Sequence, residues 1–458
     1  MNLEITQPAL RLIADALRET PFDGKVWMVG GAVRDTVLFG SEIKDIDLCT
    51  TLDASELVDL LWNRGLADHS PTHYGRFGTA MVHVAGEKIE VAITRKESYS
   101  ETSRKPEVEP ATLQEDAHRR DFTINALYWN LSSQEIEDPT GMGFKDAEAK
   151  VLRTPLNPES TFSEDPLRMF RAVRFRSRLG YAYAEGLADA IRASAHRVEI
   201  LSPERIRDEL NQILMGPRRD QALQDLLELG LLAEVLPELP PMIGVTQGSY
   251  HKYDVWDHTR AVVAAMEASR PVEAWAALLH DVAKPITRSI DDEGRIRFFT
   301  HELKGADMAR AILNRLRFSA DEIDEVALLV RNHMRLGNTV RPTPTVARRL
   351  LRDLGESLDS FFALLEADAR GMKSEGKDFN LEPYREATRQ VLSTTKVEML
   401  DSPLDGKELM ERFNREPGPW IKAVKARLTD AVLDGEIEAG DKDAAWALVE
   451  REGLVGPA

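Results

Sequence analysis

The sequence predicts a small α/β head with a mixed sheet and helices, followed by a mainly α-helical neck, body and tail. Within residues 26–94, short apolar or alternating runs of strand length alternate with segments of helical spacing. After residue 156, apolar residues recur at helical spacing instead, as in residues 164–175 and 202–214. A chain of 458 residues is long enough for two to four domains.

Residues 26–51 contain a glycine turn, an arginine and two spaced carboxylates. The apolar residues 26–29 predict a buried strand that ends at Gly30 and Gly31, where the missing Cβ atoms let backbone N–H groups approach an anion. Residues 32–38 predict a helix whose first N–H groups point at the same place, and Arg34 adds a guanidinium. This turn is therefore a predicted phosphate-binding site.

The alternating residues 44–48, KDIDL, predict a strand with one wet face, on which Asp45 and Asp47 lie side by side. Two carboxylates this close repel each other unless a cation lies between them, and Mg²⁺ prefers such oxygen ligands. The pair predicts half of a two-metal phosphoryl-transfer site. The alternative is a solvated strand end.

The order GGAVRD and then KDIDL resembles the class II tRNA nucleotidyltransferase and bacterial poly(A) polymerase family. The resemblance implies a polymerase-β-like nucleotidyltransferase head with Mg²⁺ at Asp45 and Asp47. It also implies template-independent addition of CCA to the 3′ end of tRNA from CTP and ATP. Poly(A) addition, or addition of only CC or only A, is the alternative, and residues 73–79, HYGRFGT, favour the CCA-adding members.

The rest of the head is predicted from shorter signals. Residues 56–65 predict a helix, and residues 72–84 and 88–94 predict two strands joined near Gly86. Glu90, on the second strand, is a candidate third catalytic carboxylate or a surface-facing glutamate. The polar, proline-containing residues 97–115 predict a mobile loop; in the family, a loop at this place helps rearrange the nucleotide pocket for the final adenosine.

Residues 119–125, RRDFTIN, match a motif of the same family without a gap. The match implies that Arg120 holds the triphosphate and that Asn125 contacts a sugar or phosphate oxygen. A charged helix start is the alternative.

Residues 164–175 predict a helix with an apolar stripe and a separate basic stripe formed by Arg168, Arg171 and Arg174. Asp165 and Arg168 match the family's EDxxR motif, which implies that they select the base, because an acceptor and a bidentate donor held together can read a pairing edge. The alternative is a helix cap with an ion pair. Arg171 is a further candidate for nucleotide binding. Residues 202–214 predict a capped helix that resembles the neck helix of the same family, and its charged residues are expected to be structural.

A second constellation occupies residues 251–368, where histidines and acids stand on otherwise apolar helices. Their order, with Lys284-Pro285 after the His-Asp pair, resembles the HD phosphohydrolase superfamily. The resemblance implies a two-metal site for Mn, Fe, Co, Ni or Zn and a metal-activated water that attacks a phosphoester. Buried core histidines are the alternative for each residue, and a hydrolase whose head only binds nucleotides or RNA is the alternative function. The candidate ligands are His258, His280, Asp281, His301, His333 and Asp368.

We expect four parts: a nucleotidyltransferase head (1–155), a helical neck that recognises the base (156–245), an HD domain (246–375) and a helical tail (376–458) with possible tRNA binding. In the tail, Lys422, Lys425 and Arg427 form either an RNA-backbone patch or an ordinary solvated helix face. The net charge of −18 argues against binding nucleic acid through bulk charge, so local basic patches must hold any RNA.

The remaining composition predicts a cytoplasmic protein. The single cysteine, Cys49, cannot form an internal disulfide and is expected to be a small buried hydrophobe. No run approaches the roughly 20 apolar residues of a membrane span, and residues 1–20 lack the pattern of an export signal. The expected partners are the tRNA 3′ end, CTP and ATP, with no membrane and no obligate protein partner.

Overall fold

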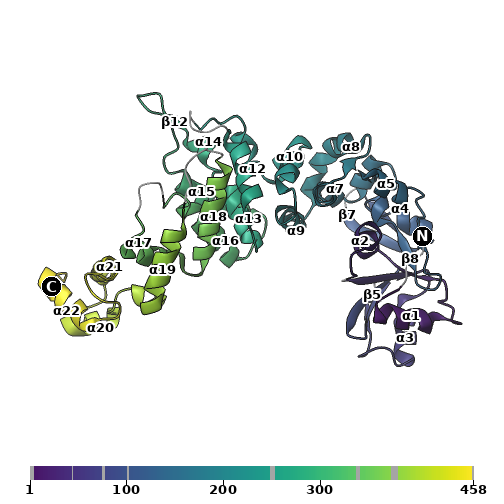
Figure 1. The fold of residues 1–458 in the computed structure, drawn as a ribbon, viewed down its shortest axis with the longest axis horizontal. Helices are drawn as coiled ribbons and strands as arrows, with labels where there is room; N and C mark the ends of the chain where they lie inside the picture. The colour runs from purple at the N-terminus through teal and green to yellow at the C-terminus, as the bar shows by residue number, and fades with distance from the viewer. Residues whose placement is uncertain are drawn as a thin grey trace. The chain divides into compact units, whose positions relative to one another are not determined.

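The computed structural model describes residues 5–43, 45–74, 78–100, 103–247, 253–336, 341–372 and 380–455. The described chain divides into two compact units, Met1–Pro237 and Glu238–Ala458. Figure 1 shows that the strands of the sheet lie near the N-terminus and that the second unit is mostly helical. Within the described ranges, no helix is both long enough and apolar enough to cross a membrane.

The first unit contains a mixed sheet, which in the described residues has seven strands in the order β3-β4-β5-β2-β1-β8-β9. Strands β2 and β5 are parallel, and the other neighbours are antiparallel. The predicted mixed sheet is thus confirmed. The strands are β1 (Val26–Met28), β2 (Ile46–Thr50), β3 (Thr72–Tyr74), β4 (Thr79–Val84), β5 (Glu87–Ile93), β8 (Tyr128–Asn130) and β9 (Ile136–Glu137).

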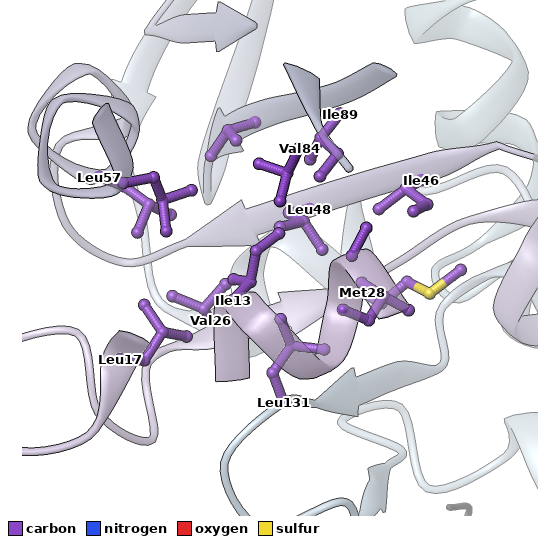
Figure 2. Packing of buried hydrophobic residues seen from close by; sticks show 14 of the residues in the cluster. Ile13, Leu17, Val26, Met28, Ile46, Leu48, Leu57, Val84, Ile89 and Leu131 are labelled. Carbon is purple, nitrogen blue, oxygen red and sulfur yellow. The ribbon is translucent and has the colours of Figure 1, made fainter. Parts of the chain in front are cut away.

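Helices α1 (Pro8–Leu17) and α3 (Ala54–Asn63) pack on one face of this sheet. Figure 2 shows Ile13 and Leu17 of α1 and Leu57 of α3 around Val26 and Leu48 of the sheet, and all five side chains are buried. Each buried aliphatic side chain contributes about 1.5–3 kcal/mol of hydrophobic stabilisation. Side chains alternate along a strand, so Ile46 and Leu48 of β2 point into this core. Asp47 between them therefore lies on the opposite face of the sheet.

Two expectations about the head were wrong in detail. Residues 72–84 form the antiparallel pair β3 and β4 rather than one strand; residues Gly75, Arg76 and Phe77 of the motif there lie outside the described residues, as does Lys44. Residues 97–115 contain most of a hairpin of β6 (Arg95–Ser100) and β7 (Ser103–Pro110) and the start of α4 (Leu113–His118), not a loop. Local antiparallel pairing satisfies this backbone despite its prolines.

The other elements of the first unit are mostly helical. The predicted helix at 164–175 breaks between α6 and α7, because Pro166 has no N–H group and disfavours helical backbone at Asp165, whose φ is −138°. The helix predicted at 202–214 is confirmed as α9, but its expected cap is absent, because the Ser202 side chain makes no cap hydrogen bond. These elements are α2 (Gly31–Phe39), α5 (Gly143–Ala149), β10 (Val151–Leu152), α6 (Pro158–Glu164), α7 (Leu167–Leu179), β11 (Ala182–Tyr183), α8 (Leu187–Ser194), α9 (Pro203–Leu214), α10 (Arg219–Glu228) and α11 (Leu231–Val235), with the short 3₁₀ helices η1 (Thr123–Asn125) and η2 (Ala195–Ile200).

The second unit is built from helices, with one small hairpin of β12 (Ser289–Ile290) and β13 (Ile296–Arg297) among the described residues. Trp275, Phe361 and Phe362 are buried among its helices. The helices are α12 (Val255–Ala265), α13 (Pro271–Leu279), α14 (Lys284–Thr287), α15 (His301–Arg315), α16 (Ala320–Asn332), α17 (Pro344–Leu354), α18 (Leu358–Gly371), α19 (Glu382–Thr394), α20 (Gly406–Phe413), α21 (Pro419–Asp434) and α22 (Lys442–Glu452), with 3₁₀ helices η3 (Pro240–Met242), η4 (Gly355–Ser357) and η5 (Val397–Leu400).

The tail helices α20, α21 and α22 share a small hydrophobic core. Arg427 of the predicted basic patch forms ion pairs within the tail: its guanidinium lies 2.7 Å from a carboxylate oxygen of Glu436 and 2.7 Å from one of Glu452. Lys422 and Lys425 are exposed on the same helix. The patch therefore consists of two lysines without the arginine.

Candidate nucleotide and metal sites

The glycine turn lies directly against the acidic strand. Gly30 has a φ of 85° and a ψ of −153°, which residues with a Cβ rarely adopt. A Cβ built on Gly30 would lie 3.7 Å from Asp47 Oδ2, and one built on Gly31 would lie 3.4 Å from Arg34 Nη2. The fold thus brings the predicted phosphate turn and a predicted metal ligand together.

Three carboxylates gather on one face of the sheet. Asp47 and Glu90 are opposite each other in the parallel pair of β2 and β5, and Asp45 precedes β2. Partial burial raises the pKa of Asp47 most, and the negative charges of Glu90 and then Asp45 raise it further. Three exposed carboxylates gathered in this way suit an oxygen-ligated divalent cation. Lys88 Nζ contacts Glu90 Oε1 at 2.6 Å and partly offsets the charge.

Arg34 is buried rather than open to solvent. Its Nη1 donates to Asn125 Oδ1 at 2.7 Å, and its Nε donates to Asp35 Oδ1 at 2.7 Å. Burial lowers the pKa of Arg34, and the charge of Asp35 opposes this shift. Arg34 therefore orients Asn125 at the edge of the RRDFTIN segment.

The same chain of hydrogen bonds continues to α7. Asn125 Nδ2 donates to Asp121 Oδ1 at 2.9 Å, and Arg171 Nη2 lies 2.6 Å from Asp121 Oδ2. Burial alone would raise the pKa of Asp121, but Arg171 and the hydrogen bonds hold it below its usual value. The structure thus joins Arg34, Asn125 and Arg171, three predicted nucleotide-binding residues, through Asp121.

Arg120 lies on the other side of this segment. Its Nε donates to Tyr128 Oη at 2.8 Å, its Nη2 lies 3.1 Å from Asp116 Oδ2, and its guanidinium stacks 5.0 Å from the centre of the Tyr128 ring. Burial would lower its pKa, but Tyr128 and Asp116 raise it. The Arg120 guanidinium is thus fixed near Asp47, and its positive charge acts to lower the pKa of that carboxyl group.

Asp165 and Arg168 have separate side-chain partners. Arg168 is buried and donates to Glu164 Oε2 at 3.0 Å and to the Arg119 carbonyl at 2.6 Å. Asp165 accepts from the Leu167 N–H at 3.1 Å and from Arg205 Nη2 at 2.9 Å. The N-cap position of α7 is Pro166 and not Asp165, and the ion pair of Arg168 is with Glu164.

In the HD region, the carboxylate of Asp281 stands between two pairs of histidines. Its Oδ2 lies 3.2 Å from His280 Nε2 and 3.6 Å from His258 Nε2. Its Oδ1 lies 3.4 Å from His301 Nε2 and 3.7 Å from His333 Nε2. Asp368 Oδ1 completes the first group, 3.0 Å from His258 Nε2. All six predicted ligands are therefore brought together around one aspartate.

The donor set fits two cations. The Nδ1 atoms of His280, His301 and His333 lie 2.9, 2.7 and 2.7 Å from the carbonyls of Ala277, Phe298 and Val330. Donation there leaves the Nε2 lone pairs facing inward. Nε2 atoms face each other at 3.3 Å between His258 and His280 and at 3.2 Å between His301 and His333. Such lone pairs repel unless a cation lies between them.

Asp281 itself supports this fit. It is buried, and neither of its oxygens has a well-oriented hydrogen bond among the described residues, although Lys284 Nζ lies 2.7 Å from Oδ2. Burial would raise the pKa of Asp281, but His280 and Lys284 hold it well below the usual value. For Asp368, burial is outweighed by the hydrogen bond from His258, which helps lower the pKa to about 2. Both carboxyl groups are thus held in the ionised form that a cation would require.

Sequence reasoning missed several residues that organise these sites. Asp121 and Glu164 were visible in their motifs, but their partners, Arg171 and Arg168, lie on α7. Arg205 was expected to be structural, but its partner Asp165 could not be inferred. Phe175 also escaped notice, although the guanidinium of Arg34 lies 4.9 Å from its ring centre. For Asp121 the signal was its charge, since a buried charge needs a partner.

Comparison with known proteins finds three family models that match along the chain. Residues 26–153 match the poly(A) polymerase head domain, residues 180–242 the probable RNA and SrmB-binding site of polymerase A, and residues 248–366 the HD domain. The A-adding tRNA nucleotidyltransferase of Deinococcus radiodurans is 34% identical over 75% of this chain and 80% of its own. The CC-adding tRNA nucleotidyltransferase of Thermus thermophilus is 32% identical over 74% and 78%.

A solved structure matches nearly the whole fold. The Bacillus stearothermophilus CCA-adding enzyme in complex with CTP has a TM-score of 0.71 and 25% sequence identity to this chain, over 98% of this chain and 99% of its own. The resemblance and the fold class predicted from the sequence are confirmed. The chain belongs to the tRNA nucleotidyltransferase family and is a nucleotidyltransferase with a polymerase-β-like head and an HD domain.

Proposed function

We propose that this chain adds C, C and A to the 3′ end of tRNA without a nucleic-acid template. In each step the terminal 3′-oxygen of the tRNA forms a bond to the α-phosphorus of CTP or ATP, and diphosphate leaves. Asp45, Asp47 and Glu90 hold Mg²⁺, which supplies charge stabilisation for the transferred phosphoryl group. The carrying observation is the placement of Glu90 opposite Asp47, with the Gly30 turn against the same carboxylate.

The proposed division of labour follows the contacts. Gly30, Gly31, Arg34 and Arg120 serve the triphosphate, and Arg171 with Asn125 serves the sugar and phosphate oxygens. Asp165 and Arg168 select the base. Their present partners, Arg205 and Glu164, satisfy both charges until a base replaces them.

The test uses purified full-length protein with Mg²⁺ and three tRNA substrates that end at the discriminator base, at C or at CC. CTP and ATP are supplied separately and together, and the products are sequenced. We expect CC from CTP alone, A on the CC substrate from ATP alone, and CCA from both. Protein that extends only the CC substrate is an A-adding enzyme, and protein that stops at CC is a CC-adding enzyme, as the named relatives are. Long adenosine tails would indicate poly(A) addition.

We propose a second activity at the HD residues, namely hydrolysis of a phosphoester with two divalent cations. The observation that favours it is the Asp281 carboxylate, whose two oxygens face different histidine pairs. Because imidazoles dominate the donor set, Mn²⁺, Ni²⁺, Co²⁺, Fe²⁺ or Zn²⁺ suits it better than Mg²⁺. A 2′,3′-cyclic nucleotide is the substrate to test with each metal, including Mg²⁺. If no metal supports hydrolysis, the proposed activity is wrong.

We further propose that the expected parts, 1–155, 156–245, 246–375 and 376–458, serve as head, neck, HD domain and tail. The neck lies mostly within the region matched to an RNA-binding model, which supports a role in holding tRNA. Exposed Lys422 and Lys425 are the proposed tail contacts. Replacing both by glutamate should weaken tRNA binding and lower its salt dependence, and unchanged binding in a filter assay would exclude the tail patch.

A further inference from the structure

Phe175 on α7 is a buried aromatic residue that contacts several cations of the nucleotide site. The guanidinium carbons of Arg174, Arg34 and Arg171 lie 4.6, 4.9 and 5.4 Å from the centre of its ring. These arginines come from two elements, α2 and α7. The negative faces of an aromatic ring attract a guanidinium at such distances.

The three positively charged guanidinium groups lie close together around the Phe175 ring. Each arginine has a carboxylate partner: Arg34 binds Asp35, Arg171 binds Asp121, and Arg174 binds Glu209. Burial lowers the pKa of Arg174; Glu209 opposes this, and neighbouring Arg171 adds to it. A carboxylate fixes one end of a guanidinium, whereas a ring also fixes its plane. Phe175 therefore adds attraction and orientation without adding another charge.

The ring is itself held in place. Phe175 is only 4% exposed, and its neighbour Phe122, in the RRDFTIN segment, packs against it with ring centres 5.7 Å apart and planes at 79°. This edge-to-face contact leaves the ring little freedom. Phe175 thus links α2, α7 and the RRDFTIN segment at one point.

We propose that Phe175 is a positioning residue for nucleotide addition, holding Arg34 and Arg171 so that Asn125 and Asp121 keep one arrangement. This inference rests on the proposed function. The residues that it orients serve phosphate and sugar, which CTP and ATP share. Loss of the ring should therefore weaken both nucleotides equally and leave base choice unchanged.

The test compares Phe175→Leu, which stays apolar but loses the ring, with Phe175→Tyr, which keeps it. The matched control is Phe170→Leu, the same change on the same helix at a buried ring over which no guanidinium lies among the described residues. We expect Phe175→Leu to raise the KM for CTP and ATP about tenfold, with kcat within about twofold. Phe175→Tyr and Phe170→Leu should keep the parent KM.

Equilibrium dialysis with labelled CTP and ATP measures the same loss without catalysis. It therefore tests the role of Phe175 independently of nucleotide transfer. If the parent protein binds CTP and ATP but transfers neither, the proposed function is wrong, and the role of Phe175 in nucleotide binding can still be tested. Parent-like affinity in Phe175→Leu would overturn the inference. An equal loss in Phe170→Leu would do so too, because it would show a general effect of core packing.

Discussion

Asp47 on β2 lies directly opposite Glu90 on the parallel strand β5, and both side chains are exposed on the same face of the sheet. Glu90 was an open choice between a catalytic and a surface residue. Its register with Asp47 favours the catalytic role, because a carboxylate facing Asp47 offers a further oxygen ligand for one divalent cation.

The first prediction concerns these acids. Asp45→Ala and Asp47→Ala should each reduce nucleotide addition at least about a thousandfold, and Glu90→Gln about a hundredfold, because a metal ligand is lost. Affinity for tRNA should stay within about twofold, since the acids serve metal rather than RNA. Single-turnover addition and a filter-binding assay measure the two effects.

Glu87→Gln is the matched control, because Glu87 is an exposed acid on the same strand. Its rate should equal that of the parent. A parent-like rate in Asp47→Ala would remove the metal assignment from this pair.

The second prediction concerns the HD residues. Asp281→Asn should abolish both metal binding and cyclic-nucleotide hydrolysis, because its oxygens face both histidine pairs. His280→Ala and His301→Ala should each weaken one of the two metals, and elemental analysis after dialysis measures the stoichiometry. Nucleotide addition should continue in all of them.

His196→Ala serves as the control for these variants, since His196 is exposed on η2 and belongs to neither group of ligands. It should keep the metal content of the parent. If Asp281→Asn also keeps that content, the histidines are core residues and not ligands.

The third prediction concerns Cys49, which is 2% exposed on the inner part of β2. Burial raises the pKa of its thiol above the usual range, so little thiolate forms at neutral pH. A thiol reagent should label no cysteine in the folded protein and one in concentrated guanidinium chloride. Because the chain has a single cysteine, fast labelling of the folded protein would contradict the buried placement directly.

Sequence reasoning succeeded where the determinants are local. Gly86 was expected at a turn between two strands. Ala85 has a φ of 52° and Gly86 a φ of 82°, and a tight two-residue hairpin turn requires such positive values. The order of the HD residues likewise identified a set that the fold brings together. It could not show that Asp281 divides that set into two groups, since this depends on where α12, α15 and the residues after α16 meet.

Failures arose where pairing between distant segments decides the outcome. The polar residues 97–110 resemble a loop, yet most of them pair in a hairpin whose register joins Lys96 to Glu109. Sequence reasoning also did not identify the partner of Arg34, whose buried guanidinium donates to Asn125, 91 residues away. Neither partner can be inferred from spacing, because sequence periodicity shows which face is buried and not what covers it.

The last prediction concerns base choice. Asp165→Ala or Arg168→Ala should relax the preference for CTP and ATP over UTP and GTP, whereas Arg34→Ala or Arg120→Ala should weaken every nucleotide alike. Phosphates are identical in all four nucleotides, so only groups that face the base edge can discriminate. Loss of a bidentate contact should cost about 1–3 kcal/mol of discrimination, or roughly tenfold to a hundredfold in relative kcat/KM. The efficiency with each of the four triphosphates measures this loss. The control is Arg197→Ala, which changes a half-buried arginine that donates to the Ser163 carbonyl. Because Arg168 is bound to Glu164 and Asp165 to Arg205, a slower Arg168→Ala enzyme with the parent's preference would show that both residues only support the junction of α6 and α7.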